Sequence, residues 1–136
     1  MLHPVLALIA WTMLMLVWLY AARITALFAH KVDPQRLTDK RLLAQLPPYA
    51  RDPADNYANL LEQPVLFYAL SSVIHLSGWG DRLFITLAWI YVGLRIVHSL
   101  IQAVHNIVIL RFCVFLCATG ILGYMLVRTI RVAFNV

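Results

Sequence analysis

Polar and ionisable side chains recur at helical spacing inside long apolar stretches of this sequence. Residues 56–70, NYANLLEQPVLFYAL, carry Glu62 into an apolar run, preceded at intervals of three by Asn59 and Asn56. Gln63, one step round the helix, is the alternative to Glu62 on this stripe. A second series, spaced by three, four and three residues as on one face of a helix, comprises Arg95, His98, Gln102 and His105. Placing an ionisable group in a bilayer costs about 2.5–3.5 kcal/mol, so these residues indicate a functional site.

The charges of these residues predict an anionic ligand. Arg23 and Arg111 lie at the ends of other apolar stretches, and together with Arg95 and Glu62 they give a formal charge of +2 with histidine neutral. A purely structural network tends towards charge balance, so the excess favours a cavity that binds an anion. The alternative is that the polar side chains only join helices to one another. No spacing typical of a metal site or a phosphate loop occurs, so no metal is expected.

Composition places the chain in a membrane. Of its 136 residues, 62% are hydrophobic and 12% are charged, with a mean hydropathy of +0.79. A soluble domain carries about twice that charged fraction. The net charge of +5 is explained by topology and contact with anionic membrane lipids. Nucleic acid is not expected as a partner, because the sequence has no basic helix or aromatic–basic surface.

The length of the apolar stretches predicts an all-α integral membrane protein, at about 20 residues per crossing. We expect a four-transmembrane-helix bundle in one domain, residues 1–136, with helices at about 4–30, 53–77, 81–105 and 107–133 and a connection at about 31–52. Asp52 can cap the second helix, because Pro53 suits a first helical position. Pro64 lies inside that helix and removes one backbone hydrogen bond.

Lysine and arginine positions predict the orientation. One side of the membrane would carry Lys31, Arg36, Lys40, Arg41, Arg51 and Arg111. The other side would carry only Arg82, Arg128 and Arg131. The positive-inside rule therefore puts the long first connection in the cytoplasm and both termini outside. The polar residues then fall in the cytoplasmic half of the membrane.

Two stretches resemble the MAPEG family, the membrane-associated proteins of eicosanoid and glutathione metabolism. They are NLLEQPVLF, residues 59–67, and RIVHSLIQAVHNIVILR, residues 95–111. The resemblance covers nearly the whole chain and implies a homotrimer that binds glutathione between neighbouring subunits. It implies a glutathione-dependent transferase or peroxidase that acts on lipophilic electrophiles, with a hydrophobic second substrate arriving through the bilayer.

The resemblance also implies roles for single residues. Arg111 would be the catalytic residue, because it matches the family arginine that lies against the glutathione thiol. The glutathione-binding residues would be Arg23, Asn59, Glu62, Arg95 and His98, with Gln102 at the position of a family tyrosine.

Two departures from the family pattern support a non-catalytic alternative. Asp55 stands where family members often carry arginine, and Gln102 stands where they commonly carry tyrosine. The same fold would then serve as a membrane assembly or lipid-binding subunit. A third class is a haem or quinone anchor, suggested by His98 and His105 on one stripe.

Overall fold

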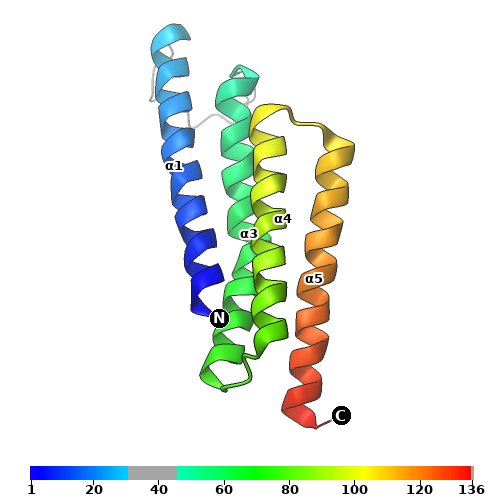
Figure 1. The fold of residues 1–136 in the computed structure, drawn as a ribbon. Coiled ribbons are helices and arrows are strands. Elements are labelled where there is room, and N and C mark those ends of the chain that lie inside the picture. Colours follow the sequence, from blue (N-terminus) through cyan, green and yellow to red (C-terminus); the bar gives the residue numbers. More distant parts are fainter. Residues whose placement is uncertain (31–45, 136) are drawn as a thin grey trace.

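The chain folds into antiparallel helices that run alternately up and down (Figure 1). The computed structural model describes residues 1–30 and 46–135. The helices in these residues are α1 (Leu2–His30), α3 (Pro48–Leu76), α4 (Arg82–Val104) and α5 (Val108–Phe134). The predicted all-α fold is therefore confirmed, with four helices in the described residues. Most of the expected connection at 31–52, with four of the basic residues used to orient the chain, lies outside the described residues.

The α3 helix begins at Pro48, earlier than the residue 53 expected from the sequence. Pro47 precedes it in an extended conformation, and Pro48 takes the first position, where proline loses no helical hydrogen bond. The pair Asp52 and Pro53 fits the same rule in the sequence but lies inside the helix. The helix then continues through Pro64 to Leu76.

Three of the helices in the described residues are long and apolar enough to cross a membrane. These are α1 over Leu2–Ala29, α4 and α5. The first half of α3 is more polar, because it carries the asparagine and glutamate residues singled out in the sequence. Apolar side chains such as Leu6, Val17 and Val127 are more than half exposed on the outside of the bundle. Such a surface suits lipid rather than water.

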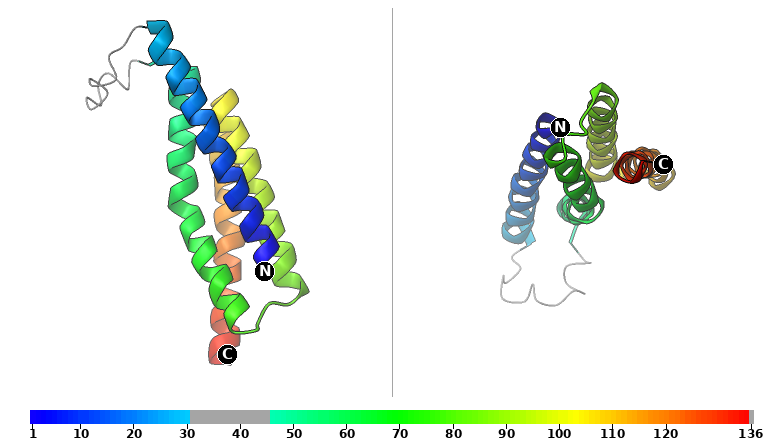
Figure 2. Two further views of the ribbon diagram at one scale, coloured as in Figure 1. Left: turned by 90° about the vertical axis from the view of Figure 1, so that its left-hand side faces the viewer. Right: turned by 90° about the horizontal axis from the view of Figure 1, so that it is seen from below.

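The helices pack unequally. α1 packs against α3 and α4, whereas α5 packs chiefly against α4 and touches α3 only slightly. Seen from below in Figure 2, α5 lies beside α4 on the side away from α1. The α3–α5 contact is therefore the weakest of these helix pairings, and the open side of the bundle lies between these two helices.

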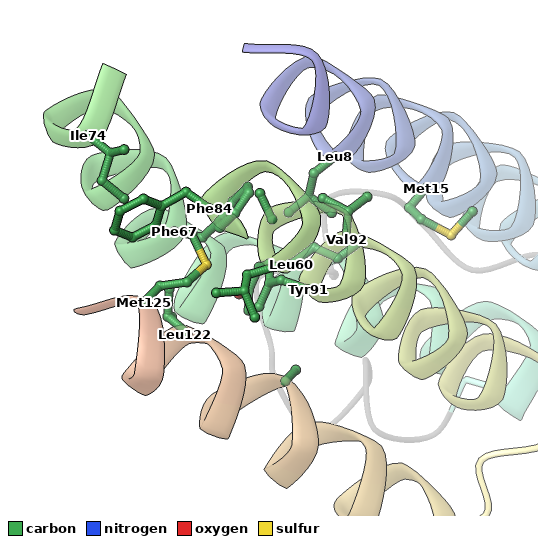
Figure 3. Packing of buried hydrophobic residues seen from close by; sticks show 13 residues of the cluster. Leu8, Met15, Leu60, Phe67, Ile74, Phe84, Tyr91, Val92, Leu122 and Met125 are labelled. Atoms are coloured by element: carbon green, nitrogen blue, oxygen red, sulfur yellow. The ribbon is translucent and has the colours of Figure 1, made fainter. Parts of the chain in front are cut away.

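The apolar core joins all four helices around one aromatic pair (Figure 3). The rings of Phe67 and Tyr91 stack with their centroids 4.5 Å apart, and both side chains are fully buried. Leu8 from α1 and Met125 from α5 belong to the same cluster. This core holds α3 against α4 and so fixes the height at which their polar residues meet.

Candidate functional site

Two side-chain hydrogen bonds join α3 to α4 in their polar halves. The amide of Asn56 donates to Ser99 Oγ at 2.7 Å, and the amide of Asn59 donates to Gln102 Oε1 at 2.9 Å. Asn56, Ser99 and Gln102 are buried. Asn56 and Asn59 are three residues apart on α3, and their partners are three residues apart on α4. Both bonds therefore join the faces that the two helices turn towards each other. The structure therefore brings together Asn59 and Gln102, as the sequence predicts.

Arg95 is fully buried beside these bonds and contacts the backbone of α3. Its Nη2 donates to the carbonyl oxygen of Asn59 at 2.6 Å, and its Nη1 donates to Gln63 Oε1 at 3.4 Å. In the same region, Pro64 has no N–H to donate to the carbonyl of residue 60, so α3 lacks one helical hydrogen bond. Arg95 thus donates to the carbonyl next to the one that Pro64 leaves without a helical donor.

Gln63, the alternative to Glu62 one step round the helix, links three helices. Its Nε2 donates to Thr119 Oγ1 on α5 at 2.7 Å, and its Oε1 accepts from Tyr91 at 3.5 Å. Gln63 is seven residues after Asn56, close to two full helical turns, so it lies on the same face. This spacing of seven residues is the feature of the sequence that places Gln63 among the polar residues facing α4.

Glu62 and Arg23 do not join the residues described so far. The Glu62 side chain is exposed on α3 and forms no ion pair with any described residue. Arg23 is half-buried on α1, and its Nε is buried without a hydrogen-bond partner among the described residues. Neither lines the cavity described next. The expectation that Glu62 faces this set differs from the structure, because six residues after Asn56 is not a whole number of turns.

A cavity of about 200 Å³ opens between α3, α4 and the start of α5. It is lined by Asn59, His98, Val108, Arg111, Phe112 and Phe115. His98 is 3% exposed, and its Nδ1 is buried without a hydrogen-bond partner among the described residues. The rings of His98 and Phe115 have centroids 6.0 Å apart. The cavity therefore combines an arginine with the rings of a histidine and a phenylalanine.

Arg111 lies in the first turn of α5, where its backbone N–H donates to the carbonyl of Ile107 at 3.0 Å. Its Nη1 donates to Asn106 Oδ1 at 2.7 Å. The first turn of α5 has no acidic residue and no side-chain cap. The free N–H groups of a helix start favour an anion, and the arginine adds a full positive charge beside them.

No described carboxylate forms an ion pair with Arg95 or Arg111. The cavity is positive through Arg111 alone, because the other three residues of the charge count do not line it. His105 is exposed at the end of α4 and does not line it, so the two histidines of the predicted stripe do not meet there. Within the described part of the chain, no group of three or more side chains could hold a metal ion.

Comparison with known proteins gives one result. The MAPEG family model matches residues 1–131, nearly the whole chain, which agrees with the resemblance in the two motif helices. No curated protein and no solved structure matches the chain significantly.

Proposed function

Because the chain belongs to the MAPEG family and is an integral membrane protein, we propose that it is a glutathione-dependent transferase or peroxidase. Its second substrates would be lipophilic electrophiles. One observation carries the proposal: Arg111 lines a cavity at the start of a helix, where no described carboxylate pairs with it. This arrangement suits an anionic nucleophile.

The side chains around the cavity fit the chemistry of glutathione. The tripeptide carries two carboxylates and a thiol, and the cavity is lined by Arg111 and His98 beside the uncapped start of α5. When bound, glutathione would supply a thiolate nucleophile. A guanidinium beside the sulfur lowers the pKa of the thiol, which raises the thiolate fraction near neutral pH. Arg111 would thus be the catalytic residue.

The size of the cavity supports a site shared between copies of the chain. Its volume of about 200 Å³ is below the roughly 300–1,000 Å³ that small-molecule sites occupy. We therefore propose the homotrimer that the family resemblance implies, with a second copy closing the site. Glu62, exposed on a helix of a membrane protein, calls for a polar partner, because an isolated carboxylate in lipid is costly. Glu62 and Arg23 would meet glutathione or the neighbouring copy there.

We propose that the second substrate enters from the bilayer along an apolar groove. The groove has a volume of about 410 Å³ and runs between α3 and α5, lined by Gln63, Leu66, Ala69, Leu70, Val73, Thr119, Leu122, Gly123 and Leu126. It begins one helical turn beyond the cavity on both helices, at Gln63 and Thr119 after Asn59 and Phe115. Under the positive-inside orientation, the cavity would lie in the cytoplasmic half of the membrane and both termini would lie outside.

Glutathione titration into the purified protein tests this proposal. We expect binding together with an increase in the ultraviolet absorbance of the thiolate, and we expect Arg111→Ala to remove that absorbance. Arg128→Ala, which changes an arginine at the other end of α5, is the control and should keep it. Absence of binding, or a thiolate signal that persists in Arg111→Ala, would exclude the proposed function.

A non-catalytic membrane assembly or lipid-binding subunit is the second candidate. It is favoured by the way the polar side chains of α3 and α4 bind one another, since the amides of Asn59 and Gln102 pair and Arg95 binds a backbone carbonyl. Loss of oligomer stability in Glu62→Gln and Arg111→Ala would support this role. Unchanged oligomers with abolished turnover would exclude it.

A further inference from the structure

The turn between α4 and α5 contains an asparagine in an unusual backbone conformation. Asn106 has φ +47°, in the left-handed region, and among the described non-glycine residues it shares a positive φ only with Asn135. Its backbone N–H donates to the carbonyl of Ile101 at 2.7 Å and closes the end of α4. Glycine suits this conformation best, whereas asparagine is tolerated. The side chain of Asn106 therefore calls for an explanation beyond backbone geometry.

The contact of that side chain supplies the explanation. Asn106 Oδ1 accepts from Arg111 Nη1 at 2.7 Å, across the turn that links the two helices. A cation in the first turn of a helix is electrostatically unfavourable, because the helix start already carries partial positive charge. A carbonyl oxygen offsets this cost by hydrogen bonding but does not cancel the charge. A carboxylate would cancel it.

We infer that Asn106 is a positioning residue for Arg111. The left-handed turn aims its neutral carboxamide at one N–H of the guanidinium, which fixes the direction of the side chain. The remaining N–H groups and the whole positive charge stay available to an anion in the cavity. The role of that anion as a glutathione thiolate rests on the proposed function, whereas the effect of Asn106 on Arg111 does not.

Chemical modification of Arg111 tests the contact without glutathione. The full-length protein in detergent is treated with phenylglyoxal, and the rate of modification at Arg111 is followed by peptide mass spectrometry. Asn106→Gly keeps the backbone conformation and removes the acceptor, so we expect modification to be about fivefold faster. Asn106→Asp also tolerates this conformation and should slow modification, because a carboxylate binds the cation more tightly.

Matched controls separate this effect from a change in folding. Asn135→Gly makes the same exchange at the other positive-φ asparagine, at the far end of α5, and should leave the Arg111 rate unchanged. Arg131 in the same samples serves as the internal reference. Equal Arg111 rates in wild type, Asn106→Gly and Asn106→Asp would overturn the inference, and so would a rise at Arg131 as large as that at Arg111.

The thiolate titration distinguishes failure of this inference from failure of the proposed function. If glutathione binds as proposed, Asn106→Asp should move the thiolate titration to higher pH than Asn106→Gly does, since only the aspartate cancels the arginine charge. Titrations that match wild type in both variants would overturn the positioning role while the proposed function stands. A wild type without thiolate signal excludes the proposed function, and the phenylglyoxal rates still decide the role of Asn106.

Discussion

The two ends of α5 each carry an arginine, and the protein holds them in opposite ways. Arg128 near the end of α5 forms a two-pronged ion pair with Asp81, at 2.9 Å and 2.5 Å, and its guanidinium lies 4.4 Å from the centroid of the Phe84 ring. Arg111 at the start of α5 is held by a neutral amide at 2.7 Å. The first arginine is neutralised by its partner, whereas the second keeps its charge.

The difference extends to the helix starts at the two ends. Asp81 caps α4, because its carboxylate accepts from the N–H of Phe84 at 2.9 Å, so the same residue caps one helix and binds the other. α5 begins without a side-chain cap or an acidic residue in its first turn. At the end of α5 near Asp81, the arginine and the helix start thus share one carboxylate of this chain. The other end leaves the first N–H groups of α5 without a side-chain cap and an arginine lining a cavity, an arrangement that favours an external anion.

The largest expected effect is on turnover, when each of the two arginines is replaced by alanine in a separate variant. If the comparison is correct, Arg111→Ala lowers glutathione turnover of a lipophilic electrophile about 100-fold, as removal of one preorganised donor does at other sites. Arg128→Ala should leave turnover near that of the wild type, because Arg128 lies at the far end of α5. Turnover measured in detergent at saturating glutathione checks this. Equal losses in both variants would mean that the two ends do not differ in function.

Stability should separate Arg95 from Arg128. Arg95→Met removes a buried cation and leaves the carbonyl of Asn59 and Gln63 Oε1 without this donor, so we expect a loss of about 2 kcal/mol in the free energy of unfolding. Arg128→Met should cost less, because its ion pair is partly exposed. Unfolding by sodium dodecyl sulfate titration measures both. A larger loss for Arg128→Met would contradict a structural role for the buried arginine.

The fold follows from the sequence because its long apolar stretches leave few alternatives. The sequence does not decide at which residue each helix begins. Asp52 with Pro53 and Pro47 with Pro48 satisfy the same rule for a helix start, and only the folded chain distinguishes them. The same limit applies to the turn at Asn106. Its residue type permits a left-handed conformation, but contact with Arg111 depends on how α5 leaves the turn.

The predicted polar set was partly recovered, for a geometric reason. Arg95, His98 and Gln102 lie on one buried face because their spacing follows the helix closely. Glu62 is marked by its charge and its interval of three from Asn59, whereas its alternative Gln63 lies seven residues after Asn56, follows the helical period better and makes the contacts. Periodicity therefore predicted position better than charge did. The roles of all these residues in glutathione binding remain predictions.

A double-mutant cycle on Asn56 and Ser99 measures how much their hydrogen bond contributes to the stability of the protein. Their bond is buried and neither residue lines the cavity, so the bond should contribute to stability alone. We expect a coupling free energy of about 0.6–1 kcal/mol, typical of side-chain hydrogen bonds in membrane proteins. Unfolding free energies of Asn56→Ala, Ser99→Ala and the double variant give this value. Glutathione affinity lost in parallel with stability would place the pair in the site instead.

The smallest effect concerns acid stability at the neutralised end. Hydrogen bonds from Arg128 and from the N–H of Phe84 lower the pKa of Asp81 to about 2, below the ordinary value of about 4. A carboxyl whose pKa is lowered by folding stabilises the protein fully above its unfolded pKa and loses that contribution as pH falls. Stability should therefore decline between about pH 4 and pH 2 in the wild type, and this part of the decline should be absent in Asp81→Asn. Detergent unfolding at successive pH values measures the difference. Identical acid profiles would show that the pair with Arg128 does not stabilise the ionised carboxylate, and the contrast with Arg111 would then rest on geometry alone.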